Sequence, residues 1–125
     1  MKKHFLQLRD VSAYRKALSI AQNVWRIVST WDYFSRDTMG KQFVRSADSI
    51  SANIAEGFGK YTKKDRVHYY HNAYGSMNES MDWLLKAHFR KKISDEEFKV
   101  LMEQLKSLPR EIRALIHFTN TRLTI

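Results

Sequence analysis

The chain has 125 residues, of which 43% are hydrophobic and 28% are charged, and its formal net charge is +9. This length and composition are typical of one globular domain over residues 1–125. There is no cysteine, which excludes disulfide bonds and thiolate metal sites, and no apolar stretch is long enough to cross a bilayer. The N-terminus also lacks the apolar run of a signal peptide, so we expect a cytoplasmic protein with no membrane partner.

The first predicted helix covers residues 13–31. Only four glycines and one proline interrupt the whole chain, which favours long helices. In this first segment apolar residues recur at steps of three and four, as on one face of a helix. These positions are Ala13, Ala17, Ile20, Val24, Ile27 and Trp31.

The second predicted helix has its apolar positions at Phe43, Ala47, Ile50 and Ile54. Ser35 is its expected N-cap, and Gly57 and Gly59 are expected to stop it.

The third predicted helix follows Thr62, which forms a capping-box pattern with Asp65. Its apolar face continues at the same spacing as in the first two segments. This face consists of Val67, Tyr70, Tyr74, Met77, Met81, Leu84 and His88.

The fourth predicted helix follows Ser94, which forms a second capping-box pattern with Glu97. Pro109 falls inside its apolar pattern, so we expect a kink or a break near Leu108. The apolar positions are Phe98, Leu101, Leu105, Leu108, Ile112 and Leu115.

Four such segments joined by short connections predict an all-α fold. A mean step of 3.5 residues keeps one apolar seam per helix against its neighbours, as in left-handed helix packing. Short connections make consecutive helices antiparallel. The sequence therefore predicts an antiparallel, up-down-up-down, left-handed four-helix bundle.

Motifs for catalysis or cofactor binding are missing from the sequence. No glutamate has a histidine three positions later, which excludes the usual di-iron bundle site. His68 and His71 stand one helical turn apart but lack a matched carboxylate, so they are weak candidates for a metal site. There is no Gly-x-Ser-x-Gly or phosphate-binding glycine loop. We expect no catalytic residue, no metal and no cofactor.

A second, small and polar face runs along the second predicted helix. Gln42, Ser46, Ser49, Asn53 and Glu56 repeat at the spacing of the apolar face. Such short side chains let another backbone approach closely and form hydrogen bonds across the gap. We expect this face to pack against the third predicted helix or against another subunit.

The third predicted helix offers a matching surface off its apolar seam. Gly75 should cost about 1 kcal/mol relative to alanine there, which is reasonable where another backbone packs tightly. Two aromatic residues flank it that we expect to be exposed in an isolated bundle, which is typical of an interface. This surface comprises Tyr69, Asn72, Gly75, Ser76, Glu79 and Trp83.

Glu56 is unfavourably placed in the last turn of its helix. A carboxylate there faces the negative end of the helix dipole. Arg45 lies about 16 Å away along the axis, too far to form an ion pair. We expect the partner of Glu56 to come from another helix, another subunit or a bound ligand; the alternative is a glutamate that is simply solvated.

Two sequence blocks, 45–60 and 64–79, resemble the bacterial four-helix-bundle family named for the 23S rRNA intervening-sequence protein. That family has Ala-x-Ser-Ile, then Asn-Ile-Ala-Glu-Gly, and later Ala-x-Gly-Ser with a glutamate three residues on. The matching residues are Arg45, Ala47, Ser49, Ile50, Asn53, Ile54, Ala55, Glu56, Gly57, Ala73, Gly75, Ser76 and Glu79. Asp48, Ser51 and Arg66 depart from the family's usual residues.

The resemblance implies more about how the protein assembles than about its activity. Members of this family form homopentamers, which leads us to expect a homo-oligomer. The distantly similar accessory protein of diversity-generating retroelements is a basic pentamer that works with a reverse transcriptase and nucleic acid.

Charge adds a hypothesis about partners, because basic clusters suggest a polyanion. Residues 86–93 carry four lysines or arginines and no acid. The first hypothesis is a non-enzymatic protein that binds RNA, with Tyr61 as a stacking residue. The alternative is a scaffold for a partner protein, such as an accessory subunit of a reverse transcriptase. The expected nucleic-acid contacts are Lys41, Arg45, Lys60, Tyr61, Lys63, Lys64, Arg90, Lys91 and Lys92.

Overall fold

The computed structural model describes residues 6–123, and within that range it contains four long helices and no strand. The long helices are α1 (Ser12–Val28), α3 (Lys41–Phe58), α4 (Lys63–Phe89) and α5 (Asp95–Arg122). A short 3-10 helix, η1 (Leu8–Asp10), precedes α1. One turn of helix, α2 (Tyr33–Ser35), and a π-helical turn, η2 (Arg36–Gly40), lead directly into α3.

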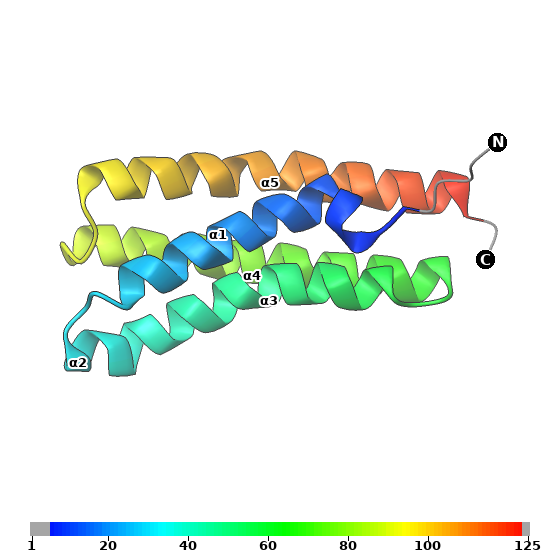
Figure 1. Ribbon diagram of the computed structural model, residues 1–125. Coiled ribbons are helices and arrows are strands. Elements are labelled where there is room, and N and C mark those ends of the chain that lie inside the picture. Colours follow the sequence, from blue (N-terminus) through cyan, green and yellow to red (C-terminus); the bar gives the residue numbers. More distant parts are fainter. Residues whose placement is uncertain (1–5, 124–125) are drawn as a thin grey trace.

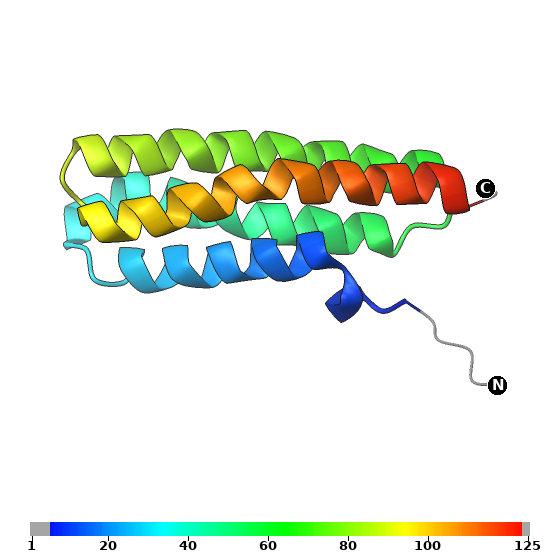
Figure 2. The ribbon, with the colours of Figure 1, turned by 90° about the horizontal axis from the view of Figure 1, so that it is seen from above.

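The long helices lie side by side, and consecutive ones run in opposite directions (Figure 1). Seen from above, α1 and α4 lie on opposite sides of the bundle (Figure 2). Each of them packs against both α3 and α5. The predicted all-α four-helix bundle is confirmed, while its left-handed sense stays a prediction.

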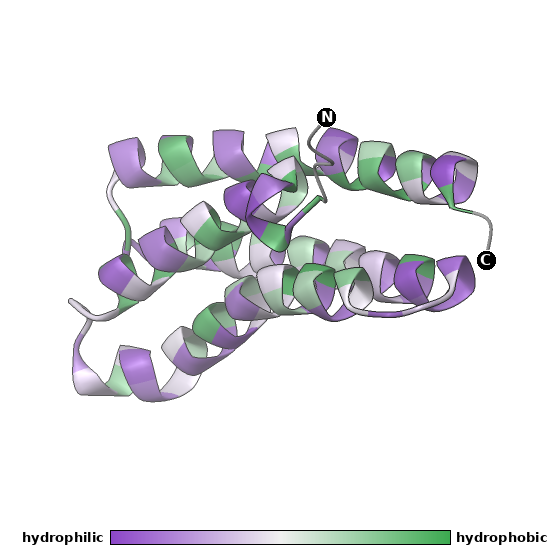
Figure 3. Cartoon of the chain, turned by 45° about the vertical axis from the view of Figure 1, so that its right-hand side comes forward, coloured by the Kyte–Doolittle hydropathy of each residue, from purple (hydrophilic) through white to green (hydrophobic). Residues whose placement is uncertain are grey.

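The core is built from the apolar seams that the sequence predicts. Figure 3 shows hydrophilic and hydrophobic residues alternating along the helices, as expected where one side of each helix faces its neighbours. Ile20, Phe43, Ile54, Leu84 and Leu105 are all fully buried. The third seam is the least buried, since Val67, Tyr74, Met81 and His88 keep part of their surface exposed.

Helices α3 and α4 approach each other through small residues. The Ser80 hydroxyl on α4 donates to the Ser46 hydroxyl on α3 over 3.0 Å, and both side chains are buried. A Cβ atom at Gly57 would lie 2.8 Å from the Tyr70 ring and 2.9 Å from the Arg66 carbonyl oxygen. At Ser46, the small polar face of α3 therefore packs against α4, the third long helix. This is one of the two arrangements that the sequence predicts.

Two of the three predicted N-caps are confirmed. Thr62 accepts a hydrogen bond from the Asp65 backbone N–H, and Ser94 and Glu97 form a reciprocal capping box. The prediction for Ser35 is wrong, because the helical path to α3 begins earlier and Asp32 caps it. The N–H and the hydroxyl of Ser35 both donate to the Asp32 carboxylate.

Two predicted interruptions are confirmed only in part. Gly59 caps the C-terminus of α3 as expected, but Gly57 does not stop the helix, which continues to Phe58. Helix α5 runs through Pro109 without a break. Proline removes only one N–H donor there, while Leu105, Leu108 and Ile112 remain buried on both sides of it and hold the segment in place. The alternative of a kink near Leu108 stays a prediction.

Candidate nucleic-acid interface

The predicted nucleic-acid contacts lie at the two ends of the bundle. Residues 60–64 lie at one end, in the connection from α3 to α4 and the first turn of α4, and residues 90–92 connect α4 to α5 at the other end (Figure 1). Lys41 and Arg45 lie in the first turns of α3, near the second of these ends. Since Lys41 and Lys60 are about 28 Å apart along the helix axis, the nine residues form two surfaces and not one.

Three of the predicted cations have a carboxylate partner within the chain. Lys41 pairs with Asp37 at 2.8 Å, Lys60 with Glu56 at 3.3 Å, and Lys92 with Asp32 at 3.0 Å. The hydrogen bond to Asp37 raises the pKa of Lys41, and that to Glu56 raises the pKa of Lys60. Hydrogen bonds from Ser35 and then from Lys92 hold the pKa of Asp32 well below its usual range. These pairs are solvent-exposed, so each stabilises the chain only weakly.

The other five predicted cations form no ion pair with any residue in the described range: Arg45, Lys63, Lys64, Arg90 and Lys91. Lys91 follows the C-cap of α4 in the left-handed backbone region, with φ 59°, a conformation that glycine adopts more readily. Lys63 and Lys64 begin α4 beside Tyr61, whose side chain is 75% exposed. An open aromatic ring next to unpaired lysines has the composition of a single-strand binding surface.

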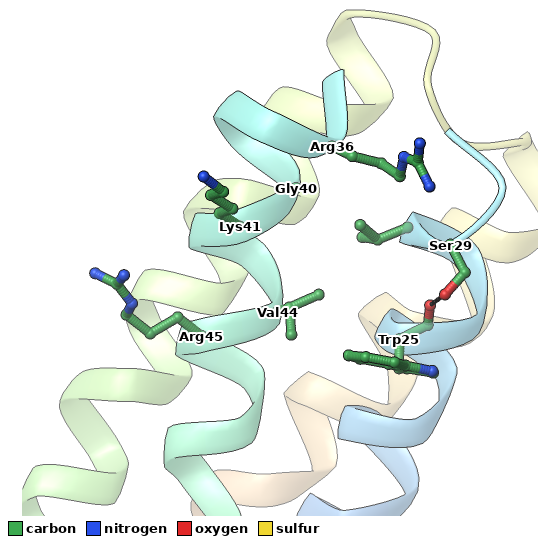
Figure 4. A pocket seen from close by; sticks show the side chains of 8 residues that line it. Trp25, Ser29, Arg36, Gly40, Lys41, Val44 and Arg45 are labelled. Carbon is green, nitrogen blue, oxygen red and sulfur yellow. Dashed lines mark hydrogen bonds between the residues drawn. The ribbon is translucent and has the colours of Figure 1, made fainter. Parts of the chain in front are cut away.

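Sequence reasoning missed a groove between the end of α1 and the start of α3. Its volume is about 460 Å3, and Figure 4 shows eight residues that line it. Trp25 and Val28 come from α1 and Val44 from α3. Trp25 is 61% exposed because it lies off the apolar seam of α1. The sequence signal that could have indicated this groove is Trp25 itself, a large aromatic residue just outside the apolar seam and next to Arg26.

The charged residues of this groove are all basic. Arg36, Lys41 and Arg45 line it, and none of the eight lining residues is acidic. The Arg36 guanidinium extends over the end of α1 near Ser29, whereas Lys41 and Arg45 point away from Trp25 (Figure 4). Within residues 6–123, Arg36 forms no ion pair and no side-chain hydrogen bond.

The predicted interface residues on α3 find their partners inside the chain. The Ser49 hydroxyl donates to the Arg45 carbonyl, and the Asn53 amide donates to the Ser49 carbonyl. Glu56 pairs with Lys60, four residues later. The prediction that Glu56 needs another helix, another subunit or a ligand is therefore wrong, since the chain beyond Gly59 brings Lys60 back over the end of α3.

The corresponding surface of α4 is mostly open. No atom lies within 4 Å of the position of a Cβ at Gly75, so the tight packing expected there is not formed within the described chain. Glu79 is exposed and Ser76 is partly buried. Tyr69 and Trp83 were expected to be exposed, but both are partly buried, and Trp83 packs against the core.

Of the α4 histidines, only His88 pairs with an acidic residue in the described chain, Asp95 at 3.0 Å. His68 lies within 3.5 Å of Asn72 and edge-on to Tyr69. In the part of the chain that the structure describes, no three histidine, aspartate or glutamate side chains come together as a metal site would require. The helices of the same part include none that is long and apolar enough to cross a membrane.

Comparison with known families decides where the chain belongs. The family model of the 23S rRNA-intervening sequence protein matches residues 9–114. The chain is a member of this family. No curated protein matches it. The match includes both sequence blocks and all nine predicted nucleic-acid contacts, so these residues lie within the family's own domain and not in an appended segment.

A solved structure of related fold agrees with the family's architecture. It is a crystal structure of a protein of unknown function from the S23 ribosomal protein family of Bacteroides thetaiotaomicron VPI-5482. The two chains superpose with a TM-score of 0.73 at 22% identity, over 83% of this chain and 97% of the other. At this identity the similarity shows a shared fold.

Proposed function

We propose that this member of the 23S rRNA-intervening sequence family is a non-enzymatic, homo-oligomeric protein that binds RNA through its basic ends. The observation that carries the proposal is the group of five cations with no carboxylate partner in the described chain, two of which follow exposed Tyr61 in the sequence. Unpaired lysines and arginines can bind phosphates without first giving up an ion pair. The family description, which names 23S rRNA, supports RNA over other polyanions.

The surface at residues 60–64 is tested by charge reversal. Titration of a fluorescently labelled structured RNA at low salt should show binding by the unaltered protein. The variant Lys63→Glu/Lys64→Glu should lose at least about tenfold in affinity, because two phosphate contacts become repulsive. Its control, Lys99→Glu/Lys106→Glu, makes the same charge change at exposed positions of α5. Absence of RNA binding at low salt, or equal losses in both variants, contradicts the proposal.

The open face of α4 is the proposed contact between subunits, in a homopentamer. A Cβ at Gly75 would have no neighbouring atom within 4 Å, so we expect an isolated bundle to accommodate Gly75→Leu, which also improves helix propensity. The variant should therefore fold and yet form smaller particles in light scattering, because the leucine blocks a close approach. Glu103→Leu, at an exposed position of α5, should keep the assembly. A monomeric wild-type protein would contradict this part of the proposal.

A second candidate function is docking to a partner protein. Phe34 and Phe89 are 73% and 89% exposed near the α4–α5 end, where large apolar side chains suit a protein contact. Affinity capture from lysate, with and without nuclease, separates the two functions. A partner protein that survives nuclease treatment favours docking, whereas recovery of RNA that nuclease abolishes favours RNA binding.

A further inference from the structure

We propose that the groove between α1 and α3 binds one unpaired nucleotide of an RNA strand, with the base on Trp25 and a phosphate on Arg36. This inference rests on the proposed RNA-binding function and assigns that function a site for single strands. The groove volume of about 460 Å3 lies within the usual range of small-molecule sites. It is thus large enough for a single nucleotide.

The aromatic part of the site is already in place. Trp25 is 61% exposed, and Val28 and Val44 are the aliphatic residues that line the groove with it. The Ser29 hydroxyl donates to the Trp25 carbonyl over 2.6 Å, which holds the last turn of α1 that borders the groove. A partly exposed indole offers a flat face on which any base can stack.

The charge of the groove selects an anion. Lys41 is neutralised by Asp37 and points away, which leaves Arg36 as the lining cation that extends toward the end of α1 (Figure 4). The absence of an acidic residue among the lining residues favours a phosphate over a basic peptide. A planar guanidinium can bind two oxygens of one phosphate at once.

The closed end of the groove depends on Gly40. A Cβ at this position would lie 2.9 Å from Val28 and 3.1 Å from the Ser35 carbonyl oxygen. Only glycine lets η2 lie so close against α1, and this contact positions Arg36 above the groove. A base can lie against the Trp25 ring only when it is not stacked in a duplex, so the site discriminates single strands from double strands.

The test compares an unstructured oligoribonucleotide with an RNA duplex of equal charge. Trp25→Ala should bind the single strand about tenfold more weakly and the duplex unchanged, because only the single strand offers a free base. Arg36→Gln should weaken single-strand binding and reduce its salt dependence by about one counterion. The single strand should also quench tryptophan emission in the unaltered protein but not in Trp25→Phe, where Trp31 and Trp83 remain. Phe118→Ala, which removes an exposed aromatic outside the groove and outside the basic ends, is the matched control.

The possible outcomes separate this inference from the proposed function. If Trp25→Ala is folded by circular dichroism and keeps its single-strand affinity, the site is wrong although RNA binding stands. Equal loss for single strand and duplex also contradicts base stacking. A smaller particle mass in Trp25→Ala, without a selective loss of single-strand binding, would make the groove a contact between copies and overturn the inference. Absence of all RNA binding by the wild-type protein removes the proposed function itself.

Discussion

One side of helix α3 is closed, because it packs against α4. Another side is open at the start of the helix, where it borders a groove beside α1. Toward α4 it presents Ser46 and Gly57, which are buried against Ser80 and Tyr70. Toward the end of α1 it leaves a groove beside exposed Trp25. Both sides contain features that suggest function in the sequence, but only the open side has unpaired cations and free aromatic surface. Short polar side chains here build the bundle, and we propose that binding belongs to the exposed ends.

The largest loss of stability is expected at Gly57, on the side of α3 that packs against α4. Gly57→Ala places a methyl group against the Tyr70 ring and the Arg66 carbonyl, which cannot both move away. We expect a loss of about 2 kcal/mol in the free energy of unfolding, measured in urea. The control is Gly59→Ala, whose nearest atoms would be 3.6 Å from the new Cβ and which should change stability by less than about 0.5 kcal/mol. Equal stability of both variants would show that α3 and α4 are not closely packed.

A smaller effect is expected from the buried hydroxyl pair. Ser80→Ala removes the donor to Ser46 and should cost about 1 kcal/mol. The double variant with Ser46→Ala should lose less unfolding free energy than the sum of the two single variants, because both substitutions remove the same hydrogen bond. Strict additivity in urea unfolding would mean that the two hydroxyl groups do not interact.

The smallest effect is expected at the open end, in the pH dependence of stability. Because the pKa of Asp32 is lowered in the folded chain, its contribution is present above about pH 4, the usual aspartate pKa, and is lost as pH falls toward the folded value. The melting temperature of the wild type should therefore fall more below pH 4 than that of Asp32→Asn, which keeps a capping side chain without the charge. Parallel curves for the two proteins would contradict this role of the carboxylate.

The sequence predicted the bundle well because core burial follows a simple helical period. Ile20, Ile50 and Leu108 are buried as that period requires. Sequence signals for helix ends were less reliable where two nearby residues can both act as the N-cap. Asp32 and not Ser35 caps the helical segment that leads into α3. A carboxylate accepts hydrogen bonds more strongly than a hydroxyl, and spacing alone does not show where a helix begins.

The candidate site was only partly predictable. Basic clusters at 60–64 and 90–92 are visible in the sequence, but their separation to opposite ends follows from the helix directions. Glu56 seemed unpartnered because an ion pair with Lys60 depends on how the chain leaves α3. Trp25 was missed because its groove is formed by two helices and by the close approach of Gly40, which one-dimensional periodicity does not describe.

The most direct test of the account is the salt dependence of RNA affinity for the wild type and for Lys63→Gln/Lys64→Gln. If phosphates bind the open basic ends, the logarithm of the association constant should fall linearly with the logarithm of salt concentration. The slope of the double variant should be shallower by about one to two counterions. Affinity that does not change with salt, or identical slopes for the two proteins, would contradict binding at this surface.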